Sequence, residues 1–227
     1  MMVACTMTKT ALALATILLC GCHRAADIAA MRMADKDWQR PNQIAAANPS
    51  HPAWLLVFDG DSITVGHGLR QQESYPARVV RALQESGENI DAFNVARCFD
   101  TTVDLLGRAA QTDSLAVRKP YAKRVLIAWA GTNDLYRGET VEMTSGRIRR
   151  YISGRESAGF RVLYLAPMAR PQGGKPLFFE RSRLRLIGLF GNGIQSVGAP
   201  ALLDGVHLDS AGAAQVASSI VQMLHGL

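Results

Sequence analysis

The sequence contains few cysteines, and none of them forms a recognisable metal-binding or disulfide pattern. Its 227 residues include four: Cys5, Cys20, Cys22 and Cys98. No CxxC pair and no cysteine–histidine cluster with zinc-ligand spacing occurs, so a structural metal site has no support from the sequence. Cys98 is the single cysteine beyond residue 22. We interpret it as a small buried residue, because no local feature indicates a reactive thiol.

Long apolar runs are also missing. The run ALALATILLCGC, which follows Lys9, is too short to span a bilayer as a mature helix but suits a secretory signal. It ends in Leu19-Cys20-Gly21-Cys22, which resembles a bacterial lipobox, whose last cysteine receives the lipid. We therefore expect residues 1–21 to be a lipoprotein signal peptide and Cys22 to be lipidated. An ordinary signal peptide and an uncleaved anchor are the alternatives.

Export of this kind predicts a location in the bacterial cell envelope, anchored by lipid on the periplasmic side. The residue after Cys22 is His23 rather than aspartate, which would favour the outer membrane in a bacterium that has two membranes. One acyl chain anchors a protein only marginally, so stable attachment requires more than one.

The charged residues give no indication of a nucleic-acid partner. They make up 19% of the chain, and the formal net charge of +6 falls by one without residues 1–21, where Lys9 is the only charged residue. Short basic groups spaced two residues apart, such as Arg181, Arg183 and Arg185, alternate around a helix rather than forming one stripe. No RNA- or DNA-binding signature accompanies them. We interpret these groups as solvated helix faces that favour anionic surfaces.

Residues 22–50 differ in composition from the remainder of the chain. They are rich in alanine and polar residues, contain Pro41 and Pro49, and lack a sustained apolar period. We interpret this segment as a flexible tether and expect one folded domain over residues 51–227, since 48% hydrophobic residues are enough for a core.

Within that domain, short apolar runs alternate with amphipathic stretches, and such alternation predicts an α/β fold with a parallel sheet covered by helices on both faces. Strands are predicted at 54–58, 90–95, 124–129 and 161–166, with a weak one at 195–197. Helices are predicted at 74–85, 102–116, 141–158, 177–189 and 210–224.

Ligands of such sheets bind beyond the carboxyl ends of the strands, and the unusual residues of this sequence follow predicted strands. Ser62, in the segment GDSITVG, follows the first strand, where a sharp turn would present its hydroxyl to a cleft. The segment GTND, which contains Asn133, follows the third strand. Asp204 lies three residues before His207, so it can accept the Nδ1 proton and leave Nε2 free to act as a base.

The segments GDSITVG, GTND and DGVH, in this order and spacing, resemble those of the SGNH (GDSL-type) hydrolases over residues 54–224. The resemblance implies a flavodoxin-like three-layer α/β/α sandwich with a mostly parallel five-stranded sheet. It implies Ser62 as nucleophile, His207 as base, Asp204 as the residue that orients the base, and the Asn133 amide as an oxyanion donor. It also implies hydrolysis of carboxylic esters or thioesters without a cofactor.

One element departs from the family. Phe99 stands where the family has a glycine whose N–H joins the oxyanion hole, although the flanking Asn94 and Asp100-Thr101-Thr102 match. We expect Phe99 to keep a negative φ and its N–H donor while its ring narrows the acyl site, so that acetyl esters are preferred. In the alternative, the turn is displaced. The oxyanion hole formed by Ser62, Phe99 and Asn133 then loses one of its donors.

Other interpretations remain open at this point. Ser62 and Asn133 could be helix caps, and His207 a solvated turn residue. Asp59 and Asp61 also resemble the aspartates of Mg²⁺-dependent haloacid-dehalogenase phosphatases, but GTND and DGVH would then be unexplained. A non-catalytic binding module and an acyltransferase with the same triad are further alternatives. The natural substrate is an ester of a small molecule, a glycan or a lipid, and the sequence does not choose among them.

Overall fold

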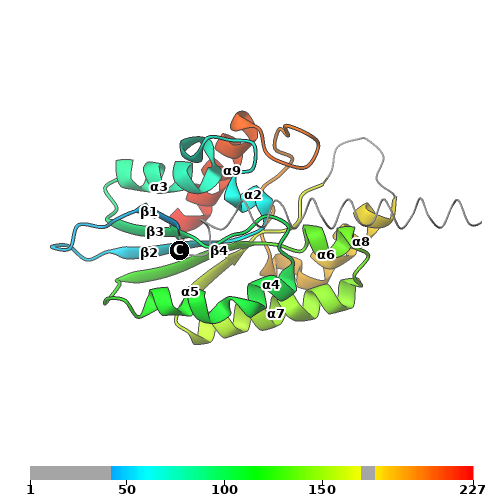
Figure 1. Cartoon of the computed structure of the whole chain (residues 1–227), viewed down its shortest axis with the longest axis horizontal. Helices are drawn as coiled ribbons and strands as arrows, with labels where there is room; N and C mark the ends of the chain where they lie inside the picture. Colours follow the sequence, from blue (N-terminus) through cyan, green and yellow to red (C-terminus); the bar gives the residue numbers. More distant parts are fainter. Residues whose placement is uncertain (1–41, 170–176, 227) are drawn as a thin grey trace, which may run out of the picture. The chain divides into compact units, whose positions relative to one another are not determined.

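A five-stranded sheet in the order β1-β3-β2-β4-β5 organises the chain (Figure 1). The computed structural model describes residues 42–169 and 177–226. The central strand β2 (Trp54–Gly60) pairs in parallel with β3 (Ile90–Asn94) on one side and β4 (Lys123–Trp129) on the other. β5 (Arg161–Tyr164) continues the parallel sheet beside β4, and β1 (Asn42–Ala45) runs antiparallel at the β3 edge. The predicted α/β fold with a mostly parallel five-stranded sheet is confirmed.

The fifth strand is not the one expected. The segment 195–197 contributes a single parallel bridge, between Gln195 and Leu165, rather than a strand. The fifth strand is β1, which lies in the segment 22–50 that the composition had indicated as a tether. The Ala47 N–H also donates to the Asp91 carboxylate at 2.7 Å. The folded unit therefore begins before residue 51, and the expected boundary is wrong. The proposed signal peptide and Cys22 lie outside the described residues.

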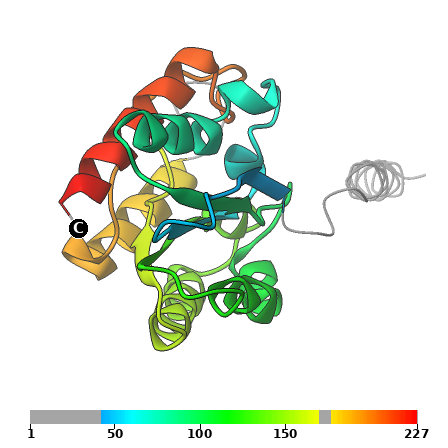
Figure 2. The same ribbon diagram turned by 90° about the vertical axis from the view of Figure 1, so that its left-hand side faces the viewer.

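Helices cover the two faces of the sheet (Figures 1 and 2). One apolar core lies between the sheet and the helices α3 (Tyr75–Glu85) and α9 (Ser210–His225). The opposite core is closed by four helices: α4 (Thr102–Gly107), α5 (Ala109–Ala116), α7 (Val141–Ser157) and α8 (Leu177–Phe190). Shorter helices are α2 (Ser62–Val65), η2 (Gln71–Glu73), α6 (Thr132–Tyr136) and η3 (Gly191–Gly193). None of the helices that the structure describes is long and apolar enough to cross a bilayer.

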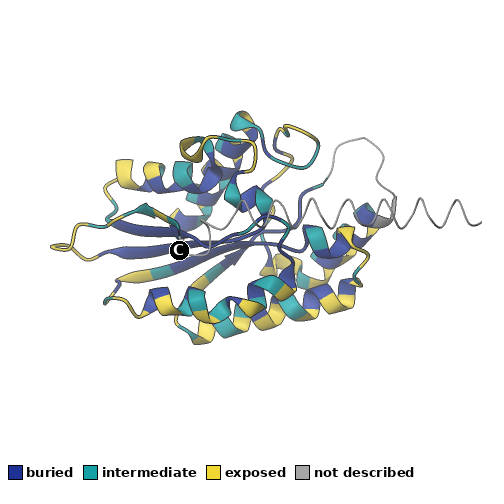
Figure 3. Ribbon diagram, in the orientation of Figure 1, coloured by how far each residue is buried: buried dark blue, intermediate teal, exposed yellow. Residues whose placement is uncertain are grey.

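Strand β2 is buried along its whole length (Figure 3). Its side chains alternate between the two cores: Leu56 and Phe58 face α3 and α9, whereas Leu55 and Val57 face the other layer. Burying one such side chain contributes about 1.5–3 kcal/mol. Because both faces are covered, the strand is a continuous apolar run, and its polar residues begin only where it reaches the carboxyl edge of the sheet.

The helix predicted over 102–116 is divided at Arg108, which is the C-cap of α4 and the N-cap of α5. Gly107 precedes the break, and glycine weakens a helix interior by about 1 kcal/mol relative to alanine. Arg108 turns inward and is only 6% exposed. The helix is therefore interrupted at Arg108, and the guanidinium of this residue is buried near the carboxyl edge of the sheet.

Candidate active site

The predicted site residues meet at the carboxyl edge of the sheet. Ser62 follows β2, the loop of residues 95–101 follows β3, and Asn133 lies in α6 after β4. The turn with His207 precedes α9, and it approaches α2 although 145 residues separate it from Ser62 (Figure 1). Parallel strands end at one edge, so residues distant in sequence converge there.

The turn that carries Ser62 is tightly specified. Asp61, rather than Ser62, is the N-cap of α2, and its carboxylate accepts the Ile63 N–H at 3.0 Å. Gly60 has no room for a side chain, because a Cβ there would lie 2.4 Å from both Thr64 Oγ1 and Trp129 O. Ser62 is therefore the first helical residue, and its hydroxyl is free of the capping role.

His207 contacts both of its predicted partners. Its Nε2 lies 2.9 Å from Ser62 Oγ, and its Nδ1 lies 2.8 Å from Asp204 Oδ2. The other carboxylate oxygen of Asp204 accepts the main-chain N–H groups of His207 at 2.7 Å and Val206 at 3.0 Å. This arrangement suits a neutral imidazole that donates from Nδ1 and accepts a proton at Nε2. The alternative of a solvated turn histidine does not account for the contact with Ser62.

The Asp204 carboxylate is held in its ionised form. Partial burial acts to raise its pKa, but hydrogen bonds from the His207 and Val206 N–H groups and from the His207 ring outweigh burial and lower the pKa to about 2. The folded-state pKa lies below the ordinary value, so this interaction stabilises the fold above that value and is lost as the pH falls towards 2. Asp204 therefore remains an acceptor for Nδ1 wherever His207 is neutral.

Phe99 lies in the left-handed backbone region that favours glycine. Its φ is 66°, and it is the single non-glycine residue with positive φ in the ranges 42–169 and 177–226. The expectation of a negative φ is therefore wrong. The left-handed region costs a non-glycine residue about 1–2 kcal/mol.

Neighbouring hydrogen bonds hold the Phe99 turn in this strained form. The Arg97 N–H donates to Gly60 O at 3.2 Å, which fastens the start of the turn to the end of β2. The Arg137 guanidinium donates to Phe99 O at 2.8 Å. The Asn94 amide donates to Thr64 O at 2.9 Å and so ties the preceding strand to α2. The surrounding contacts, rather than the residue itself, therefore set the positive φ.

Two main-chain donors are left without acceptors at this edge. Among the residues described, no hydrogen-bond acceptor contacts the N–H of Ser62 or of Phe99. Asn133 Nδ2 donates to Asp100 O at 2.9 Å and lies 3.5 Å from Asp61 Oδ2, so one of its two hydrogens has only a long contact. With the Asn133 amide, these two main-chain groups are the three donors that the family resemblance assigned to an oxyanion hole, and main-chain donors without an acceptor can stabilise a developing oxyanion.

Asp134 caps a helix, but not its own. Gly131 is the N-cap of α6, whereas the Asp134 carboxylate accepts the N–H of Thr102 at 3.0 Å and also the Thr102 hydroxyl, at the start of α4. Burial raises the pKa of Asp134, and the bonds from Thr102 act against this shift. The GTND turn is thereby joined to the start of α4, directly after the loop that contains Phe99.

A buried ionic cluster underlies both turns, and no local pattern in the sequence indicated it. Arg108 pairs with Asp59 and Asp100 and donates to Gly60 O at 3.0 Å, while the Tyr151 hydroxyl donates to Asp59. Burial raises the pKa of Asp100 to about 6, against the opposing attraction of Arg108. Removing one partner of a buried ion pair costs about 3–5 kcal/mol. The cluster therefore fixes the nucleophile turn relative to the Phe99 turn.

Asp59 also bears on the phosphatase interpretation. Its carboxylate is 0% exposed and is occupied by Arg108 and Tyr151, so it cannot attack a phosphorus atom in the cleft. Asp61 is occupied by the helix cap. Within residues 42–169 and 177–226, no group of three or more His, Cys, Asp or Glu side chains is arranged to hold a metal ion.

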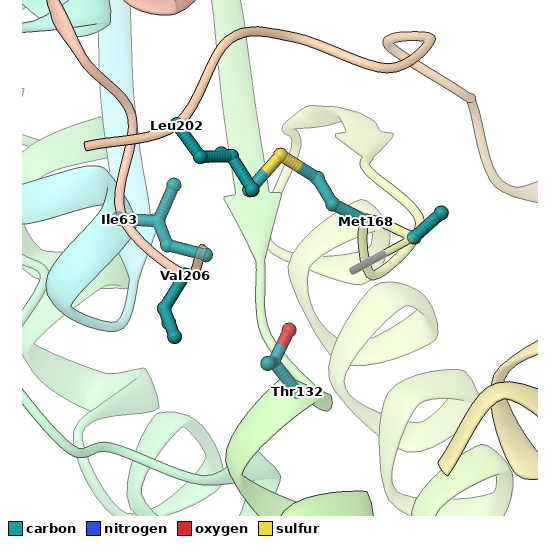
Figure 4. A pocket seen from close by; sticks show the side chains of 6 residues that line it. Ile63, Thr132, Met168, Leu202 and Val206 are labelled. Atoms are coloured by element: carbon teal, nitrogen blue, oxygen red, sulfur yellow. The ribbon is translucent and has the colours of Figure 1, made fainter. Parts of the chain in front are cut away.

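A small apolar cavity of about 10 Å³ lies next to the predicted site residues (Figure 4). Three of its lining residues, Ile63, Thr132 and Val206, are the immediate sequence neighbours of Ser62, Asn133 and His207. Met168, Ala169 and Leu202 complete the lining. The Thr132 hydroxyl is buried, and no hydrogen-bond partner for it occurs among the described side chains and main chain. A cavity of this size holds about one water molecule or a group as small as a methyl.

A family model described as the GDSL-like lipase/acylhydrolase family matches residues 58–209. The chain belongs to this family. The resemblance to SGNH hydrolases that the sequence motifs indicated is thereby confirmed. An arylesterase from Vibrio mimicus is 26% identical to this GDSL-family chain over 121 residues, which cover 53% of the chain and 58% of the arylesterase. The chain therefore spans little more than half the length of that curated relative.

Solved structures of acetylesterases have the same fold as this GDSL-family chain. Est24, a carbohydrate acetylesterase from Sinorhizobium meliloti, is 17% identical with a TM-score of 0.58, over 77% of this chain and 99% of Est24. Axe2, an acetylxylan esterase from Geobacillus stearothermophilus, is 18% identical with a TM-score of 0.57, over 74% of this chain and 92% of Axe2. At these identities the similarity establishes the fold and not the substrate.

Sequence patterns missed several residues that lie at or beside the site: Arg108, Tyr151, Arg137 and His67, whose ring centroid is 4.5 Å from that of His207. A buried arginine within a predicted helix has no local signature, because its partners lie on other elements. Phe99 was singled out only by its departure from the family pattern, and that departure located the strained turn correctly while giving the wrong sign of φ.

Proposed function

We propose that this chain is a serine esterase that hydrolyses short-chain carboxylic esters, acetyl esters above all. The observation that carries the proposal is the contact of His207 Nε2 with Ser62 Oγ at 2.9 Å while Asp204 holds Nδ1. Membership of the GDSL-like family and the acetylesterase activity of proteins with the same fold support it.

In the proposed mechanism, His207 Nε2 takes the Ser62 hydroxyl proton as Oγ attacks the ester carbonyl carbon. The oxyanion accepts hydrogen bonds from the N–H groups of Ser62 and Phe99 and from the Asn133 amide. The carbon–oxygen bond to the alcohol then breaks, and the alcohol leaves with the proton from His207. Water, deprotonated by the same histidine, attacks the acyl-enzyme, and the carboxylic acid leaves as Ser62 recovers its proton.

The small cavity supports the choice of acyl group. Its apolar lining, with Ile63, Val206 and Met168, suits a methyl group, and its volume of about 10 Å³ is that of a small group. Forcing additional methylenes into a packed apolar site costs about 1–3 kcal/mol. We therefore propose acetyl esters as the preferred substrates, with the alcohol unspecified by these contacts.

A series of nitrophenyl esters tests this function. For the purified protein, kcat/KM is expected to fall at least about tenfold from acetyl to octanoyl, the rate effect of roughly 1.4 kcal/mol. Met168→Ala, which enlarges the cavity, should raise octanoyl hydrolysis about fivefold or more. Met143→Ala, which alters an exposed methionine of α7, is the control.

Two results would count against the proposal. Absence of ester cleavage by the wild-type protein would refute the esterase function itself, whereas equal rates for all chain lengths would refute only the acetyl preference. Quantifying the free acid, with and without an added sugar alcohol, separates hydrolysis from acyl transfer.

We also propose that the protein is exported and held at the cell envelope by a lipid on Cys22. The support is the segment Leu19-Cys20-Gly21-Cys22 behind an apolar run. Cys22→Ser is expected to move most of the protein from the membrane fraction to the soluble fraction or to leave an unprocessed precursor. Intact-mass analysis of the wild-type N-terminus checks this, and a mature terminus elsewhere that carries no lipid would rule out the anchor.

A further inference from the structure

A second histidine, His67, lies beside the ring of His207. The ring centroids of His67 and His207 are 4.5 Å apart, and the rings are tilted by 46°. Ser62 and Asp204 contact the two ring nitrogens of His207, which lie at the edge of the ring. These two contacts therefore leave both faces of the ring without support. His67 is itself exposed and contributes nothing to the apolar cores.

The turn that carries His207 is closed by the Leu202–Leu208 bridge, and these two leucines pack against the apolar core, but its tip is exposed. The Asp204 side chain is 48% exposed, and ion pairs and hydrogen bonds of exposed groups contribute little to stability. Leu203, in the same turn, is 58% exposed, and its N–H bonds back within the turn to His207 O at 2.8 Å. Most of the polar contacts of this turn are therefore local, and they do not fix it relative to Ser62.

His67, by contrast, is fixed to the turn of the nucleophile. It follows Gly66, the C-cap of α2, and its N–H donates to Ser62 O at 3.0 Å. The next residue, Gly68, also lies against the histidine turn, because a Cβ at this position would be 2.7 Å from Leu203 Cδ2. Residues 67 and 68 thus join the element that carries Ser62 to the element that carries His207.

We infer that His67 is a positioning residue for the proposed esterase reaction. Its ring provides a surface that is built on the Ser62 turn, and the His207 ring lies against it with Nε2 directed at Ser62 Oγ. The contact requires a planar ring at position 67 and does not require a proton on that ring. The inference rests on the proposed function, because its consequence is measured as the rate of Ser62 acylation.

The test compares His67→Ala, which removes the ring, with His67→Phe, which keeps a planar ring. His67→Ala is expected to lower kcat and the pre-steady-state burst rate with nitrophenyl acetate about tenfold, with KM within about twofold of wild type, since small misplacements of reacting groups slow chemistry strongly. His67→Phe should restore both rates to within about twofold. His51→Ala, at an exposed histidine before β2, is the matched control.

Each result of this comparison either supports or contradicts the positioning role of His67. Unchanged rates in His67→Ala, equal losses in the alanine and phenylalanine variants, or an effect confined to KM would each overturn the positioning role. A melting temperature of His67→Ala that stays close to wild type excludes general destabilisation as the cause of a slower burst. A wild-type protein that cleaves no nitrophenyl acetate at all would instead refute the proposed esterase function.

Discussion

Ser62→Ala and His207→Ala are each expected to lower kcat for nitrophenyl acetate by on the order of 10⁴-fold or more, since the two residues act as one unit. Without the hydroxyl no acyl-enzyme can form, and without the imidazole the hydroxyl keeps its proton. The contact of 2.9 Å between His207 Nε2 and Ser62 Oγ is the structural basis of this expectation. Steady-state kinetics of the purified variants measure it.

The double variant sharpens this prediction. Because the residues act together, Ser62→Ala with His207→Ala should be about as slow as either single variant rather than slower by the product of the two effects. Ser157→Ala, at an exposed serine of α7 whose hydroxyl bonds to Ser153 O, should retain wild-type kinetics. Near-full activity of either single variant would remove the triad assignment.

Asn133→Ala is expected to lower kcat by about 10²–10³-fold, the usual effect of losing one oxyanion donor. The variant also removes the bond from Asn133 Nδ2 to Asp100 O, which helps to hold the Phe99 turn. KM should change little, because the donor acts on charge that develops in the transition state. A loss smaller than about fivefold would show that this amide does not contact the oxyanion.

Substitutions of Phe99 provide the contrast, because its contribution is a main-chain N–H that every non-proline residue retains. Phe99→Gly should keep acetyl-ester kcat within about tenfold of wild type, since glycine adopts a φ of 66° without strain. Phe99→Ala removes the ring but keeps the Cβ and its strain. If the ring restricts acyl length, both variants should accept longer esters, whereas a large gain in acetyl-ester kcat for glycine alone would indicate an impaired wild-type hole.

The sequence by itself determined the fold class, four of the five strands and the residues that meet in the cleft. Periodicity identified β2 to β5, and short-range features such as the turn after β2 identified Ser62. Parallel strands must end at one edge, so this topology predicted that Ser62 and Asn133 converge, and the family resemblance added His207. The contacts between these side chains agree with that expectation, and their catalytic roles stay predictions until the variants are measured.

Only the tertiary structure decided the remaining features, because each depends on partners distant in sequence. β1 lies in a segment without a sustained apolar period, and it exists because the β3 edge pairs with it. Phe99 has positive φ because Arg137 and the end of β2 hold its turn. Arg108 is buried because Asp59 and Asp100 surround it. Local propensity carries no record of such contacts, and tertiary packing overrides it wherever the two conflict.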